Sequence, residues 1–108
     1  MSNKSVKQML TINTTFFVSD THSTQFLKWV NDVYIPNMLK TEHFSTHRLY
    51  KVLAEQEPSV TGFSLQFEFS EKEYHETWHE IYQPALQSEL KLLFEDNVLS
   101  FSTLLEQF

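Results

Sequence analysis

One pair of histidines has the spacing at which two imidazoles can hold a metal ion. His75 and His79 are four residues apart in a segment with helical periodicity, so both rings lie on one helix face, where Glu76 or Glu80 could help to bind a metal. The sequence supplies no third ligand, and the polar neighbours are typical of a solvated helix face. We therefore predict no metal site here.

A second group of polar residues lies in segments that alternate like strands. Arg48 and Tyr50 belong to one predicted strand, Gln66 and Glu68 to the next, and Asn13 to the first. Two interpretations of this group stay open. In one, Arg48 pairs with Glu68 and satisfies charge at a dimer interface or in solvent. In the other, the group lines a pocket in which Arg48 fixes a carboxylate or carbonyl oxygen, while Tyr50 or Glu68 handles a proton.

Tyr34 and Tyr82 are secondary candidates, because each lies two residues before a proline in a helical segment. Their phenols could contact a ligand, although tyrosine at a helix break is more often a core residue whose hydroxyl caps a backbone group. Proline disfavours helical dihedral angles in the preceding residue and suits the first position of a helix. Each helix is therefore predicted to break at its tyrosine and to resume at Pro36 or Pro84.

The elements that must position these residues follow from hydrophobic periodicity. Alternation predicts strands over residues 8–18, 44–53, 63–69 and 97–106. Helical spacing predicts one helix over 21–34 and a second that begins at a capping box, Ser70 to Glu73, and ends near Phe94. The order β-α-β-β-α-β predicts the ferredoxin-like α+β fold, a four-stranded antiparallel sheet with two helices on one face.

The same alternation divides the strand residues between the two faces of the sheet. The face expected to pack against the helices is apolar, and it comprises Leu10, Ile12, Phe16, Leu49, Leu53, Phe63, Leu65, Phe67, Phe69, Leu99 and Phe101. The opposite, open face is expected to be mainly polar, with Thr11, Asn13, Thr15, Arg48, Tyr50, Gln66, Glu68, Ser100 and Ser102. Tyr50, Val52 and Leu104 would add apolar surface to the open face, which predicts that it is covered in a homodimer.

Composition bounds the classes of partner. The 108 residues fit one domain, 1–108. The net charge of −6, without a basic cluster, argues against nucleic acid and anionic membranes as partners. The same element order builds the RNA-recognition motif, but Leu65 replaces its second stacking aromatic and Thr61 its basic residue.

The absence of cysteine excludes Cys-ligated zinc. Because the sequence has neither a signal-peptide pattern nor an apolar segment long enough to cross a membrane, we expect a cytoplasmic protein. We also expect that the protein needs no cofactor.

Four segments of the chain resemble a known family. The segments "FLKWVNDVYIPNML", "FSTHRLYKVL", "YQPALQ" and "FSTLLE" look like the corresponding blocks of small bacterial proteins catalogued as domain of unknown function 4286. That family is similar to the dimeric α+β barrel proteins, in which two ferredoxin-like sheets pack face to face and can enclose a pocket. Its members commonly carry His-x-Pro where this sequence has Tyr34 and Tyr82.

The resemblance implies a homodimer that binds a small metabolite between its two sheets. The candidate pocket is then Asn13, Arg48, Tyr50, Gln66 and Glu68. An alternative is a cofactor-free enzyme, because similar barrels host monooxygenase-like and isomerase-like reactions that use only pocket side chains. The family supplies no activity, so the sequence assigns neither a substrate nor a catalytic residue.

Overall fold

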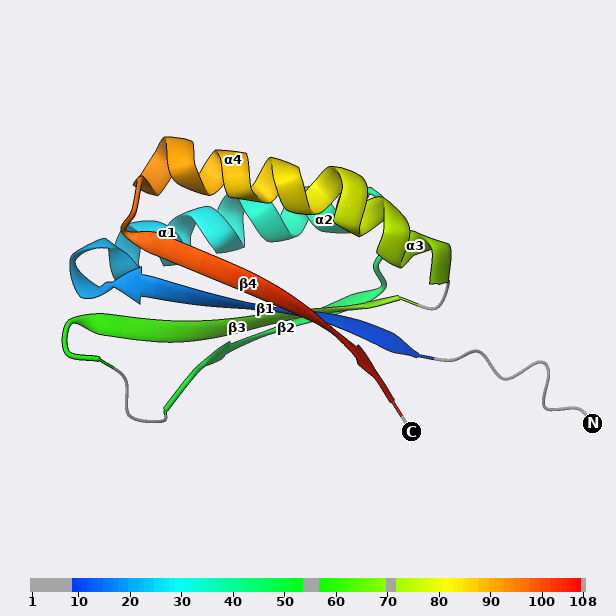
Figure 1. Cartoon of the computed structure of the whole chain (residues 1–108), viewed down its shortest axis with the longest axis horizontal. Coiled ribbons are helices and arrows are strands. Elements are labelled where there is room, and N and C mark those ends of the chain that lie inside the picture. Colours follow the sequence, from blue (N-terminus) through cyan, green and yellow to red (C-terminus); the bar gives the residue numbers. More distant parts are fainter. Residues whose placement is uncertain (1–8, 54–56, 70–71, 108) are drawn as a thin grey trace, which may run out of the picture.

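The protein consists of a four-stranded antiparallel sheet with helices packed on one face, as the computed structural model shows for residues 9–53, 57–69 and 72–107 (Figure 1). The predicted ferredoxin-like order β-α-β-β-α-β is confirmed. The elements are β1 (Leu10–Ser19), η2 (Asp20–His22), α1 (Ser23–Trp29), η3 (Val30–Tyr34), α2 (Ile35–Lys40), β2 (Thr46–Lys51), β3 (Val60–Phe69), α3 (Lys72–Thr77), η4 (Trp78–Tyr82), α4 (Gln83–Phe94) and β4 (Val98–Glu106).

The sheet has the strand order β2-β3-β1-β4, with all three neighbouring pairs antiparallel. The two long strands β1 and β3 are central and pair over their whole length, from Leu10 opposite Phe69 to Ser19 opposite Val60. The strands β2 and β4 form the two edges. Both helical segments lie above the same face, and no helix of the described residues covers the other face of the sheet (Figure 1).

The core lies between the sheet and the helices, and it is rich in aromatic rings. Along β1 every second residue from Leu10 to Val18 is buried, and along β3 the buried side chains are Phe63, Leu65, Phe67 and Phe69. The first helical segment contributes Phe26 to the centre of this layer, where its ring lies within 6.2 Å of the rings of four other core aromatics, Phe16, Trp29, Phe63 and Phe94. The strict alternation in β1 and β3 therefore defines the buried face, as predicted.

The two helical segments do not break at their tyrosines, so that prediction was wrong. Ile35 and Gln83, which precede the prolines, keep helical dihedral angles. In each case the turn before the proline is a π turn, in which the amide of Ile35 donates to the carbonyl of Val30 and the amide of Gln83 to the carbonyl of Trp78. A π turn widens the helix, and this gives the proline ring room without ending the helix.

The two faces of β4 are the reverse of the prediction. Val98 is buried opposite Val18, and the residues of β4 on the helix side are therefore Ser100, Ser102 and Leu104. Leu99 and Phe101 lie on the open face instead, as does Leu105. Polar pairing makes this orientation possible, because Ser102 Oγ lies 2.7 Å from the Oγ1 of buried Thr14, and Gln87 Nε2 donates to Ser100 Oγ at 2.8 Å.

Leu53 and Gly62 also differ from their predicted positions. Leu53 was expected in the core, but it lies beyond the end of β2 and is 87% exposed. Gly62 lies outside the predicted strand 63–69, whereas it belongs to β3, which begins at Val60. The predicted capping box from Ser70 to Glu73 rests on residues outside those whose side chains the structure describes.

Candidate functional site on the open face of the sheet

The candidate pocket residues Asn13, Arg48, Tyr50, Gln66 and Glu68 all lie on the open face, which the structure places on the side of the sheet away from the helices. Cα pairing arranges this face in four rows across β2, β3, β1 and β4. In that order the rows are Val52, Gly62, Phe17 and Leu99; Tyr50, Ser64, Thr15 and Phe101; Arg48, Gln66, Asn13 and Thr103; and Thr46, Glu68, Thr11 and Leu105.

Asn13 is the centre of a hydrogen-bonded polar cluster in the middle of the open face. Its Oδ1 accepts from Ser64 Oγ at 2.5 Å and from Gln66 Nε2 at 3.4 Å, and its Nδ2 donates to Thr15 Oγ1 at 3.4 Å. All four side chains are partly buried. Because each amide has further hydrogen-bonding capacity, the cluster can still bind a polar group that approaches from above the sheet.

Arg48 and Glu68 form the ion pair that the sequence suggested, between the edge strand β2 and the central strand β3. Arg48 Nη1 lies 3.4 Å from Glu68 Oε2, and Thr46 Oγ1 donates to Glu68 Oε1 at 2.6 Å. The side chain of Arg48 is 56% exposed and that of Glu68 is 25% exposed. A long, solvated pair of this kind contributes at most about 1 kcal/mol to stability, so Arg48 has hydrogen-bonding capacity to spare for another partner.

Apolar side chains occupy the remaining part of the open face, which sequence reasoning largely missed. Leu99 is 61% exposed, Phe101 54%, Tyr50 48% and Leu105 42%. The ring of Phe101 lies 5.7 Å from the ring of Phe17 on the neighbouring strand. The signal was present in the sequence as the alternation Leu99-x-Phe101, but it was assigned to the helix-facing side.

Tyr34 lies away from the open face, in a buried polar cluster between the two helical segments. Its ring stacks on Trp29 at 5.2 Å, and its hydroxyl accepts a hydrogen bond from the indole of Trp78. The other indole, of Trp29, donates to Glu89 Oε2 at 3.1 Å. Burial, reinforced by the negative charge of Glu89 and partly offset by the bond with Trp78, raises the pKa of Tyr34 well above its usual value. Tyr34 is therefore a neutral core residue.

Tyr82 belongs to a separate, half-buried aromatic group near the end of the sheet. Its ring lies 6.2 Å from Phe44 and 6.1 Å from His43, and His43 also lies 4.5 Å from Tyr74. The hydrophobic core accounts for these contacts. The structure thus places both secondary candidates on the helix side of the sheet, apart from Arg48 and Asn13.

His75 and His79 lie side by side on one helical segment, with ring centroids 6.2 Å apart. Within the described part of the chain, no group of three histidine, aspartate or glutamate residues is arranged to hold a metal ion. Nor does any helix in the described ranges combine the length and apolar character that crossing a bilayer requires.

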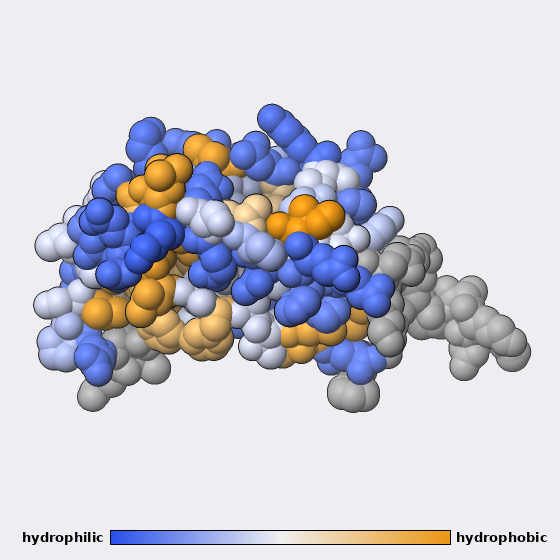
Figure 2. Space-filling view, turned by 45° about the horizontal axis from the view of Figure 1, so that its top comes forward, coloured by the Kyte–Doolittle hydropathy of each residue, from blue (hydrophilic) through white to orange (hydrophobic). Residues whose placement is uncertain are grey.

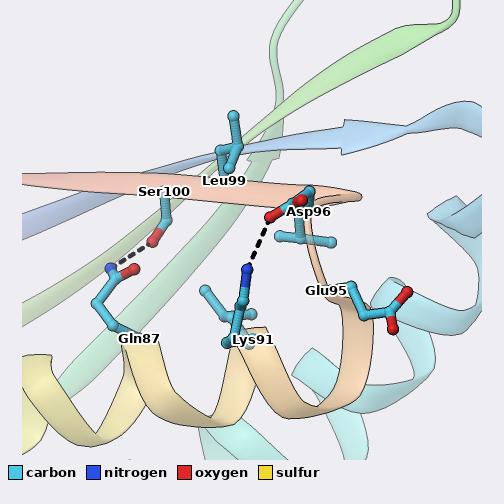
Figure 3. Close-up of a pocket in the computed structure, with 8 residues that line it drawn as sticks. Gln87, Lys91, Glu95, Asp96, Leu99 and Ser100 are labelled. Atoms are coloured by element: carbon cyan, nitrogen blue, oxygen red, sulfur yellow. Dashed lines mark hydrogen bonds and ion pairs between the residues drawn. The ribbon is translucent and has the colours of Figure 1, made fainter.

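A shallow pocket of about 260 Å³ lies between α4 and β4, at some distance in the fold from the predicted site (Figure 3). Four of its polar residues form two pairs. Lys91 Nζ lies 3.0 Å from Asp96 Oδ1, and Gln87 binds Ser100 across the pocket. Since these four groups already bind one another, they offer a ligand little beyond what water supplies.

Solved structures with the same fold include proteins that are described as dimeric. A dimeric ferredoxin-like protein from an uncultured marine organism is 19% identical, with a TM-score of 0.62 over 93% of this chain and 94% of its own. A second protein of that description is 13% identical, with a TM-score of 0.56 over 94% and 96%. An ethyl tert-butyl ether d family protein from Bacillus halodurans is 8% identical, with a TM-score of 0.64 over 92% and 99%. At these identities the likeness shows the fold alone.

The family itself is shown by a match along almost the whole chain. A comparison with curated proteins found no match. The model of a family described as "Domain of unknown function (DUF4286)", in contrast, matches residues 9–108, which include every strand and helix of the fold and all five residues of the candidate pocket. The chain therefore belongs to the DUF4286 family.

Proposed function

We propose that this protein is a homodimer joined through the open faces of its two sheets, and that the polar centre between them binds a small metabolite. The observation that carries the proposal is the row of apolar side chains on the open face. Three apolar side chains project from an edge strand into solvent, and each is at least 42% exposed: Leu99, Phe101 and Leu105. Exposed apolar residues gathered on one face mark an interaction surface.

The charge distribution supports a second copy as the partner. Among the described strand residues, Arg48 and Glu68 are the charged side chains of the open face, and they neutralise each other. The chain as a whole carries a net charge of −6. Two copies would repel each other through most of their surface, yet their open faces can meet without bringing unbalanced charge together.

The comparisons support the same arrangement. Two of the solved structures with this fold are described as dimeric ferredoxin-like proteins, and each matches over more than nine tenths of both chains. An isologous dimer of this kind covers the open face with the same face of a second copy. The extent of the domain, 1–108, and a cytoplasmic location stay predictions.

The polar side chains at the centre of the open face indicate which class of ligand could bind there. Arg48 and the amides of Asn13 and Gln66 are strong donors, and Arg48 is the single cation among them. A second sheet above them would remove bulk water and strengthen their hydrogen bonds. These donors suit a small molecule with a carboxylate or carbonyl oxygen, bound to Arg48 in a charge-assisted manner.

One substitution tests whether the open face is the interface. Phe101→Asp would place a charge within the apolar part of each open face, so we expect a single-chain mass in sedimentation equilibrium, with the fold intact by circular dichroism. Leu92→Asp is the matched control, because Leu92 is 82% exposed on α4 and lies on the helix side. A Phe101→Asp protein that keeps the mass of two chains would place the interface elsewhere.

A second experiment tests the ligand. A panel of small carboxylates and carbonyl compounds, screened by thermal shift, should contain compounds that stabilise the protein, and Arg48→Ala should abolish the shift. Lys51→Ala is the control, since Lys51 is an exposed cation on the same strand but points to the other side of the sheet. A shift that survives Arg48→Ala and is lost in Lys51→Ala would exclude the proposed site.

A further inference from the structure

The pattern of side chains on the open face also determines how two copies can be oriented. We infer that the two-fold axis of the dimer runs parallel to the strands, so that β4 of each chain covers β2 of its partner, and that the partner's Thr103 and Phe101 complete the site around Arg48. This inference rests on the proposed dimer. It concerns which residues meet, and it is tested separately from dimer formation.

The open face has a polarity gradient along the strands and a second one across them. Along the strands, the end with Phe17 and Leu99 is apolar and the row of Arg48, Gln66 and Asn13 is polar, although apolar Leu105 lies beyond that row on β4. Across the sheet, the apolar side chains of the first two rows are concentrated at the edges, where Tyr50 lies on β2 and Phe101 on β4. Figure 2, which is turned to bring the helix side forward, shows apolar surface along the lower rim of the molecule, below the charged residues that cover the helices.

Two sheets that pack with aligned strands allow two directions of the two-fold axis in the plane between them. An axis parallel to the strands places each row opposite the same row of the partner, and it places β4 of one chain opposite β2 of the other. An axis perpendicular to the strands keeps β4 opposite β4 and reverses the rows. The two directions therefore bring different residues together.

The parallel axis matches polarity in three of the four rows; in the fourth, Leu105 would face the partner's Thr46. It places Phe101 against the partner's Tyr50, and Leu99 against the partner's Val52, which buries apolar surface on both sides. It also places Arg48 against the partner's Thr103, whose hydroxyl can accept a hydrogen bond. The perpendicular axis would instead place Leu99 against the partner's Leu105, which is also an apolar match, but it would place Phe101 against the partner's Thr103 and Val52 against the partner's Thr46, where apolar surface meets polar groups.

This geometry predicts a cavity that is closed at one end. The apolar rows would seal the end of the dimer at which Phe17 and Leu99 lie. The polar rows would form the site, and Arg48 would face a residue that only the partner supplies. Each dimer then has two equivalent Arg48 sites, one near each edge of the paired sheets.

Cross-linking between engineered cysteines tests the orientation, because the natural chain has no cysteine. Tyr50→Cys and Phe101→Cys are prepared as separate variants, mixed so that subunits exchange, and treated with a short bismaleimide, which spans the roughly 10 Å between packed sheets. We expect a covalent dimer in the mixture and none in either variant alone, since the parallel axis places two copies of one residue at opposite edges. Val52→Cys mixed with Leu99→Cys is the second pair.

The outcomes separate this inference from the dimer itself. A cross-link within Phe101→Cys alone, or within Tyr50→Cys alone, would mean that like edges meet and would overturn the parallel axis. The same holds if both mixtures stay unlinked while light scattering gives the mass of two chains. If every variant and the natural protein have the mass of one chain, the proposed dimer fails first, and the orientation fails with it.

Discussion

At the scale of single residues, the molecule keeps two kinds of polar group apart. Between the helices, the two indoles have defined acceptors, Glu89 for Trp29 and Tyr34 for Trp78, so both indole N–H groups are paired. On the open face, Arg48 and Asn13 are bonded to neighbours that remain partly accessible. The buried cluster is therefore structural, whereas the open face retains capacity for an added ligand.

Tyr34 predicts a specific loss of stability in alkali. Its pKa is raised in the folded state, chiefly by burial, whereas in the unfolded chain it ionises near its ordinary value of 10.0. Above that pH the folded state holds the proton that the unfolded state has lost. Stability is therefore complete below pH 10 and falls above it by about 1.4 kcal/mol per pH unit from this group.

Urea unfolding at several pH values between 9 and 11 checks this, with Tyr34→Phe compared to the natural protein. The variant should lose stability less steeply above pH 10, although it starts lower because the indole of Trp78 loses its acceptor. Tyr50→Phe is the control, since Tyr50 is 48% exposed. Equal slopes for Tyr34→Phe and the natural protein would show that Tyr34 ionises freely in the folded state.

At the scale of the elements, the alternation of β1 and β3 was enough to predict their buried faces, because each strand has one apolar and one polar set of residues. The strand β4 has no such distinction. Val98 and Leu104 fall on one of its faces, and Leu99, Phe101 and Leu105 on the other. Periodicity alone could not choose between them, since the pairing of Ser102 with Thr14 and of Ser100 with Gln87 decides the orientation.

The helix breaks were predicted wrongly for a related reason. The rule that proline disfavours a helical residue before it is local, and it does not include a change in the hydrogen-bonding pattern one turn earlier. In both helical segments a π turn precedes the proline, so Ile35 and Gln83 stay helical. The same device in both halves supports the similarity between the two Tyr-x-Pro segments.

The π turn predicts that Pro84 is not strained. In a regular helix, replacing proline by alanine removes a clash with the carbonyl four residues earlier and gains about 3 kcal/mol. Since η4 already accommodates the ring, Pro84→Ala should change the free energy of unfolding by less than about 1 kcal/mol. Urea unfolding measures this, with Ser88→Ala as the reference for an exposed position in α4. If Pro84→Ala raised the free energy of unfolding by about 3 kcal/mol, the π turn would not have relieved the clash of the proline ring.

The core of β3 gives a prediction about packing. Phe67 is 2% exposed and contacts the rings of Tyr34 and Phe44, so Phe67→Ala should destabilise the fold by about 3 to 5 kcal/mol through the cavity it leaves. Gln66→Ala is the matched control, because Gln66 is the neighbouring residue on the open face. A loss below about 1 kcal/mol for Phe67→Ala, measured by urea unfolding, would mean that this face is not the core.

At the scale of the whole molecule, the distribution of charge and apolar surface explains why one face is left uncovered. The helices cover one side of the sheet, and the other side carries a neutralised Arg48 and Glu68 together with exposed Leu99 and Phe101. A chain that is negative overall thus keeps one face free of unbalanced charge. The proposed self-association through that face would bury its apolar edge and enclose its polar centre.

The mass of the natural protein in solution tests this account most directly. Light scattering coupled to size exclusion, at about 1 μM, detects association whose free energy exceeds roughly 8 kcal/mol. The account predicts the mass of two chains, independent of concentration down to this level. The mass of one chain would contradict it, because the open face would then be exposed in the native protein and Arg48 would lie in no enclosed site.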